Sequence, residues 1–190
     1  MPFYNGEFAI TYHHRQADLK KVSPGQIPAN DESIPEDRLG LDGKWDIGVG
    51  LWFEAVIVRQ QIDLAEMKYQ RFMNVGMDYT FSLGNGLRAL LENFIYETSN
   101  KIFGTGNNTG FSALSLSYPI SLLDQITGIV YYDWKNENWY RFINWQRTYN
   151  RWQIFLIGFW NPDQFKIYQN RGDNNLFAGK GIQIMVVLNH

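Results

Sequence analysis

Two adjacent histidines, His13 and His14, are the residues of this chain with the most obvious potential for chemistry. Imidazole and carboxylate groups that lie together can bind a divalent metal ion or relay a proton. Because adjacent residues of a β-strand point to opposite faces, the two rings are poorly placed to share one ion. We therefore expect a solvated rim here and no metal site. The carboxylates that follow these histidines are Asp31, Glu32, Glu36 and Asp37.

Groups for catalysis are otherwise scarce. The chain has no cysteine and three histidines, which excludes a thiol nucleophile, a disulfide framework and a thiolate metal site. It contains no G-x-S-x-G, H-E-x-x-H or phosphate-loop motif. We expect no enzyme and no cofactor. The formal net charge of -2, without a clustered basic face, also gives no indication of a nucleic-acid partner.

The most regular pattern in the chain is an alternation with a period of two. In segment 73–83 every odd position is apolar, and the even positions are Asn, Gly, Asp, Thr and Ser. This period predicts a β-strand with one apolar and one polar face. The charged residues that we expect on the polar side of this strand and its neighbours are Asp46, Glu54, Lys68, Asp78, Arg88, Glu92 and Asp133.

The elements that must position these charges are strands throughout. The pattern predicts an all-β protein, a single domain over residues 1–190, with ten antiparallel strands and no convincing helix. Asp42-Gly43 lies between two extended pieces and predicts a hairpin turn. The alternative is one long strand with a bulge at Gly43. Connections alternate between short and long along the chain, which is typical of an up-and-down membrane barrel.

The apolar face could cover a protein core or face lipid. No apolar run reaches the ~18 residues of a membrane helix, but strands of a membrane barrel alternate and average out as mildly polar. The alternating stretches 45–57 and 67–83 are long enough to span a bilayer, and tryptophans lie near strand ends. The residues that we expect to face lipid or form an aromatic girdle are Trp45, Val49, Leu51, Phe53, Val75, Met77, Tyr79, Phe81, Trp134 and Trp160.

The alternative is a soluble barrel like the lipocalins, in which the apolar face would point inward around a small apolar ligand. Gly43-Lys44-Trp45 matches the short G-x-W of that family, but the chain lacks the disulfide and the C-terminal helical pattern. For the charged face, two interpretations also stay open. It is either a lumen that selects solutes, or a structural salt-bridge network that fills a narrow barrel.

Three segments carry a resemblance to a known class: "GKWDIGVGLWFEA", "MDYTFSLGNGLRALLENF" and "GKGIQIMVVLNH". The chain resembles Gram-negative outer-membrane β-barrel proteins of porin-like type, over most of its length and as a pattern rather than a specific motif. The resemblance implies an antiparallel up-and-down transmembrane β-barrel of about ten strands, or an arc of a larger barrel of which this is the C-terminal part.

The resemblance also implies partners and a location. These are the lipid bilayer, small polar solutes and the bacterial outer membrane, with a C-terminal strand read by the barrel-insertion machinery. Ile184, Val186 and Leu188 hold the register of that strand, and His190 stands where such barrels usually have Phe. The first fourteen residues show no basic region followed by an apolar one, so we do not predict a signal peptide there.

Overall fold

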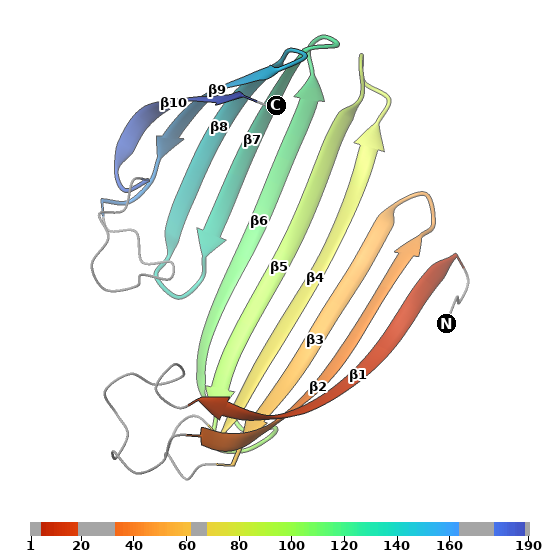
Figure 1. Ribbon diagram of the computed structural model, residues 1–190, viewed down its shortest axis with the longest axis vertical. Coiled ribbons are helices and arrows are strands. Elements are labelled where there is room, and N and C mark those ends of the chain that lie inside the picture. The colour runs from red at the N-terminus through yellow and green to blue at the C-terminus, as the bar shows by residue number, and fades with distance from the viewer. Residues whose placement is uncertain (1–4, 19–32, 62–67, 164–176, 189–190) are drawn as a thin grey trace. The chain divides into compact units, whose positions relative to one another are not determined.

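The computed structural model describes residues 5–18, 33–61, 68–163 and 177–188, and its regular elements are all strands (Figure 1). Within these ranges no helix is present that could cross a membrane. The strands are β1 (Gly6–Asp18), β2 (Ser33–Asp46), β3 (Gly50–Gln60), β4 (Tyr69–Phe81), β5 (Leu87–Ser99), β6 (Asn107–Pro119), β7 (Asp124–Asp133), β8 (Asn138–Thr148), β9 (Trp152–Trp160) and β10 (Lys180–Leu188).

The ten strands form one sheet in which each strand pairs with its neighbours in sequence, in the order β1 to β10 (Figure 1). The expectation of ten antiparallel up-and-down strands is confirmed. No ladder between described residues joins β1 to β10, so the sheet is not closed by these two strands. The turns at 47–49, 82–86, 120–123 and 149–151 all follow even-numbered strands. His190 lies outside the described residues.

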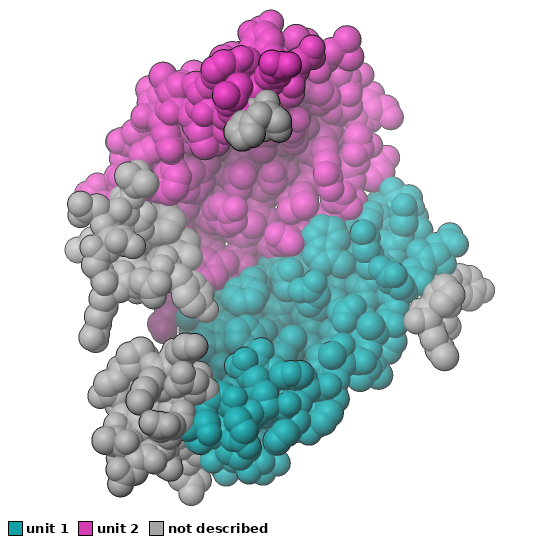
Figure 2. Space-filling model, in the orientation of Figure 1, with its two compact units in different colours: residues 1–76, 93–110 teal, residues 77–92, 111–190 magenta. Residues whose placement is uncertain are grey.

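The chain divides into two compact units (Figure 2). Unit 1 comprises residues 1–76 and 93–110, and unit 2 comprises residues 77–92 and 111–190. The division passes through β4, β5 and β6, so each unit contains parts of these strands. The two units are described separately below.

The turn expected at Asp42-Gly43 is wrong, and so is the alternative bulge. β2 runs through both residues, and Gly43 pairs one-to-one with Phe8 of β1 and Phe53 of β3. The chain turns instead at residues 47–49, where the Ile47 N–H donates to the Val49 carbonyl over 3.2 Å. Gly48 supplies the positive φ of 88° that this turn requires.

Close packing explains why residue 43 is a glycine. A Cβ added there would lie 2.4 Å from the Trp45 ring and 2.9 Å from the Phe53 ring. These two rings stack on each other, with centroids 5.8 Å apart and planes 16° from parallel. The aromatic rings therefore cover the bare backbone, a known way to stabilise a strand glycine. Glycine is therefore needed at residue 43 because of the packed rings, and the chain does not turn there.

The same relation occurs on the other side of unit 1, where the Trp52 indole lies over Gly76. An added Cβ at Gly76 would lie 2.2 Å from the Trp52 ring, whereas one at Gly128 in unit 2 would meet nothing within 4 Å. Contacts this short force a side chain off its rotamer or shift the backbone. Gly76 is therefore a position where space, not turn geometry, requires glycine.

We predict that Gly76→Ala lowers the free energy of unfolding by about 1–3 kcal/mol, the usual cost of overpacking a filled site. Gly128→Ala is the matched control and should change that free energy by no more than about 0.5 kcal/mol. Denaturant midpoints of the two folded variants provide the measurement. Equal midpoints would show that Trp52 does not require the bare backbone of Gly76.

Candidate functional site

The candidate site is the pair of opposed sheet faces in each unit. In unit 1, strand pairing places Tyr12, Leu39 and Ile57 in one row across β1, β2 and β3, on the side we call the apolar face of unit 1. The side chains of Ile10 and Tyr12 are both 67% exposed, and that of Leu39 is 51% exposed. Large apolar side chains that adjoin one another are rarely left open to water.

The apolar face of unit 1 ends at a charged row. His14, Asp37 and Arg59 pair in register across β1, β2 and β3, two residues beyond the row of Tyr12 and therefore on the same face. The Tyr12 hydroxyl donates to Asp37 Oδ1 over 2.8 Å, and His14 Nδ1 lies 2.8 Å from the same oxygen. Both groups therefore bond to the same carboxylate oxygen of Asp37.

The two histidines point to opposite faces. His13 pairs with Arg38, and His14 pairs with Asp37. Among the described residues, no group of three or more His, Asp or Glu side chains lies close enough to hold a metal ion. Asp31 and Glu32 lie outside the described residues.

Unit 2 presents a second apolar face, on β8 to β10. The register aligns Trp145, Leu156 and Ile184 in one row across these strands. Leu156 is 43% exposed and Ile184 is 71% exposed. The C-terminal end of β4 lies in unit 2 and contributes three further exposed apolar residues, Met77, Tyr79 and Phe81. Apolar side chains on this face are thus among the most exposed of the described residues.

Aromatic residues lie at both ends of the apolar face of unit 2. Trp152 and Trp160 begin and end β9 and lie on the same face, about 26 Å apart along the strand at about 3.3 Å per residue. Near the β7–β8 turn, the Tyr132 ring lies 4.7 Å from both Trp134 and Trp139. The Trp134 indole N–H donates to Ser112 Oγ over 2.9 Å. Tryptophan and tyrosine combine an apolar ring with a polar atom, and for Trp134 that atom has a hydrogen-bond partner.

On the opposite side of unit 1, which we call its polar face, a buried carboxylate binds two arginines. Glu36 is 1% exposed. Its Oε1 accepts from Arg15 Nε over 2.8 Å and from Arg38 Nε over 2.6 Å. Its Oε2 accepts from Gln60 Nε2 over 3.0 Å. Each carboxylate oxygen therefore has a partner, which a buried charge requires.

The polar face of unit 2 carries a second ion pair. Arg88 Nε and Nη2 donate to Asp78 Oδ2 over 3.2 and 2.8 Å, which joins β4 to β5. Asp133 is buried but serves the β7–β8 turn, because its Oδ1 accepts from the N–H groups of Lys135 and Asn136 over 2.9 and 3.1 Å. Its Oδ2 accepts from Asn136 Nδ2 over 2.7 Å, so both carboxylate oxygens already have donors in the turn.

Towards β8 and β9, the polar face of unit 2 becomes aromatic. Phe177 packs edge-on against Phe142 and Phe159, with ring centroids 5.8 and 5.5 Å apart. Asn161 fixes this corner, since its Nδ2 donates to the Phe177 carbonyl and its Oδ1 accepts from the Arg141 N–H, both over 2.8 Å. This packing explains why Phe159, on the polar side of β9, is apolar.

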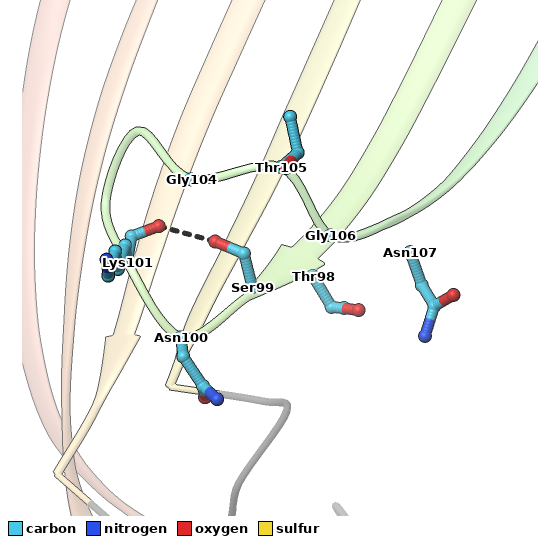
Figure 3. A pocket seen from close by; sticks show the side chains of 8 residues that line it. All are labelled: Thr98, Ser99, Asn100, Lys101, Gly104, Thr105, Gly106 and Asn107. Atoms are coloured by element: carbon cyan, nitrogen blue, oxygen red, sulfur yellow. Dashed lines mark hydrogen bonds between the residues drawn. The ribbon is translucent and has the colours of Figure 1, made fainter.

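One hollow lies in the β5–β6 connection of unit 1 (Figure 3). It has a volume of about 510 Å³, and its lining side chains are mainly hydroxyls and amides. Asn100 and Thr105 point away from each other (Figure 3). The loop is held by Arg71, which donates to the Gly104 carbonyl over 2.6 Å and contacts Glu97 Oε1 at 2.6 Å. This hollow presents no converging set of reactive groups.

The structure brings together only some of the charges predicted on the polar side. Asp78 and Arg88 form an ion pair, and Glu92 lies in unit 2 near Tyr131. Asp46 accepts from the Gly48 N–H over 3.3 Å at the β2–β3 turn, and Glu54 is exposed on β3. Lys68 precedes β4 directly. Val49, expected within a strand, lies in the β2–β3 turn.

The residues expected on the apolar side are placed as follows. Trp45 and Leu51 pair across the β2–β3 turn and so share a face with Phe53. Val75 is exposed on β4 in unit 1, and Trp134 and Trp160 are exposed at strand ends in unit 2.

Sequence reasoning missed the cluster around Glu36. The three prolines between residues 24 and 35 favour a loop there, whereas β2 begins at Ser33. No alternation of apolar and polar residues marks Ile34, Glu36 and Arg38, so the sequence offers no clear signal for this cluster.

Comparison of the chain with protein-family models, with curated proteins and with solved structures gives no match.

We predict that Glu36→Gln lowers the free energy of unfolding by about 1–3 kcal/mol, because two guanidinium groups lose a buried charged acceptor while remaining partly exposed. Glu54→Gln is the matched control, an exposed carboxylate on the polar face of the adjacent strand, and should cost no more than about 0.5 kcal/mol. Denaturant unfolding followed by tryptophan fluorescence measures both. If the two variants lost equal stability, the cluster would not be a stabilising element.

Proposed function

We propose that this chain forms all or part of an outer-membrane β-barrel of porin-like type, which passes small polar solutes or has a structural role in the membrane. The apolar faces contact acyl chains, and the polar faces line a wet interior. The sheet edges at β1 and β10 must then be paired in the membrane, with each other or with further strands, because unpaired backbone groups are costly in lipid.

The observation that carries this proposal is the apolar face of unit 2 between its aromatic ends. Trp152 and Trp160 begin and end a strand of nine residues, and a tilted strand needs about 9–11 residues to cross the apolar band of an outer-membrane barrel. Between them on the same face lie Ile154, Leu156 and Gly158. Tryptophan at both limits of an apolar band is typical of the two membrane–water interfaces.

Unit 1 supports the same interpretation independently. Its apolar face gives way to the row of His14, Asp37 and Arg59, and the hydroxyl of Tyr12 reaches that row. A tyrosine with its ring over apolar residues and its hydroxyl on charged groups matches the headgroup region of a bilayer. Ionised groups at this level stay hydrated, whereas the same groups within the band would be costly.

The lipocalin-like alternative places the apolar face around an enclosed ligand. It therefore requires side chains such as Ile10, Leu156 and Ile184 to be covered by the protein itself. Their high exposure, together with the buried Glu36 on the opposite face, favours the membrane proposal.

We expect the chain to stay folded only in detergent or lipid and to show heat-modifiable gel mobility. The physical reason is that water would contact the apolar faces in plain buffer. Folded protein in planar bilayers should give discrete conductance steps. If a closed, folded protein gave no conductance, the proposal of a solute pore would be wrong, and a structural role in the membrane would remain. Monodisperse protein in detergent-free buffer, with saturable binding of an apolar ligand, would favour the lipocalin-like alternative.

We further predict that Val75→Arg impairs folding in lipid vesicles, whereas Asn74→Arg does not. The two residues are adjacent on β4, with Val75 on the apolar face and Asn74 on the polar face. Arginine on the lipid side near the bilayer centre costs about 2–4 kcal/mol. The folded fraction during urea titration, read from heat-modifiable mobility, should drop for Val75→Arg alone. If both variants fold equally well in lipid, β4 does not face acyl chains through Val75.

A further inference from the structure

A second hollow lies on the polar face of unit 2, between β4, β5, β6 and β7. It has a volume of about 520 Å³, which falls within the range of about 300–1,000 Å³ for small-molecule sites. Most of its lining groups are hydroxyls and amides. Those that the argument uses are Thr80, Arg88, Ser115, Ser117, Gln125 and Thr127.

Strand pairing brings these groups to one side of the sheet. Ser117 pairs with Thr127, and Pro119 pairs with Gln125, so the three polar side chains share a face. Ser117 Oγ lies 3.0 Å from Thr127 Oγ1, and Gln125 Nε2 donates to Ser117 Oγ over 2.5 Å. Each hydroxyl has one hydrogen and two lone pairs, so each can still bond to a further group.

The wall of this hollow carries almost no net charge. Arg88 is the one charged residue among those that line it. Its guanidinium donates twice to Asp78 Oδ2, over 3.2 and 2.8 Å, so its charge is balanced by a carboxylate that does not line the hollow. An anion would have to compete with Asp78, and a cation would meet Arg88. The chemistry of the wall thus favours a neutral solute.

We propose that this hollow is a binding subsite for an uncharged, polyhydroxylated solute, a saccharide in chemical class. The inference rests on the proposed function, because it names the solute class that the polar face would take. Neighbouring hydroxyls of a saccharide both donate and accept, which matches a wall of hydroxyls and amides with the same dual character. Such groups reject analogues that lack hydroxyls, because wall groups would then stay unpaired.

The test is a ligand-observed NMR titration of the full chain with maltotriose. The protein is held in polyoxyethylene detergent micelles, which carry no sugar headgroups, and heat-modifiable mobility verifies that each variant is folded. We expect saturable binding of maltotriose and none of inorganic phosphate. Thr127→Val and Ser117→Ala should each weaken binding about 2- to 12-fold, the effect of one lost neutral hydrogen bond.

The matched control is Thr148→Val. Thr148 also lies on the polar face of unit 2 and accepts from a glutamine amide, Gln146 Nε2, over 3.3 Å, but it is outside the hollow. Its substitution should leave maltotriose affinity unchanged. Absence of saturation with maltotriose, or an equal loss from Thr148→Val, would overturn the subsite. So would phosphate binding that Arg88→Gln abolishes, because the hollow would then be an anion site.

This titration separates the subsite from the membrane proposal. Binding in micelles does not depend on conductance, and conductance in planar bilayers does not depend on maltotriose. Saturable binding without conductance would leave the subsite standing and remove the pore. Conductance without binding would leave the pore and remove the subsite.

Discussion

The alternation of side chains along a β-strand, carried from strand to strand by the backbone ladders, is the constraint on which this structure depends. A shift of one residue in any pairing would move every side chain of a strand to the other face. The register prevents this, because Tyr12 aligns with Leu39 and Leu39 with Ile57 in unit 1, while Trp145 aligns with Leu156 in unit 2. Two chemically different surfaces follow from these pairings.

The exposed apolar faces are unfavourable in water, and a membrane location would remove this cost. Apolar area in water costs about 25 cal/mol per Å², and here whole rows of large side chains are exposed. Something must cover them. Lipid fits because the rows end in tryptophan, tyrosine and charged groups, the order in which a bilayer changes from acyl chains to headgroups.

The opposite surface shows how charged and polar groups are paired on the other side of the sheet. Glu36 is buried with an acceptor role for each oxygen, and Arg88 is balanced by Asp78. Ser117, Gln125 and Thr127 instead form a neutral network with hydrogen-bonding capacity left over. The polar side therefore combines structural ion pairs with a neutral hydroxyl region.

The sequence by itself determined the strand count, the antiparallel order and the strict alternation of segment 73–81 in β4, because a period of two is a local property of the chain. It did not determine the role of Gly43, since the rings of Trp45 and Phe53 that require a glycine come from packing rather than local geometry. Nor did it reveal the partners of Glu36, which lie on three different strands. In β9 most residues on both sides are apolar, so the sequence pattern does not tell which side belongs to the apolar face. Only the pairing with β8 and the packing of Phe177 decide it, because register depends on contacts between residues distant in the chain.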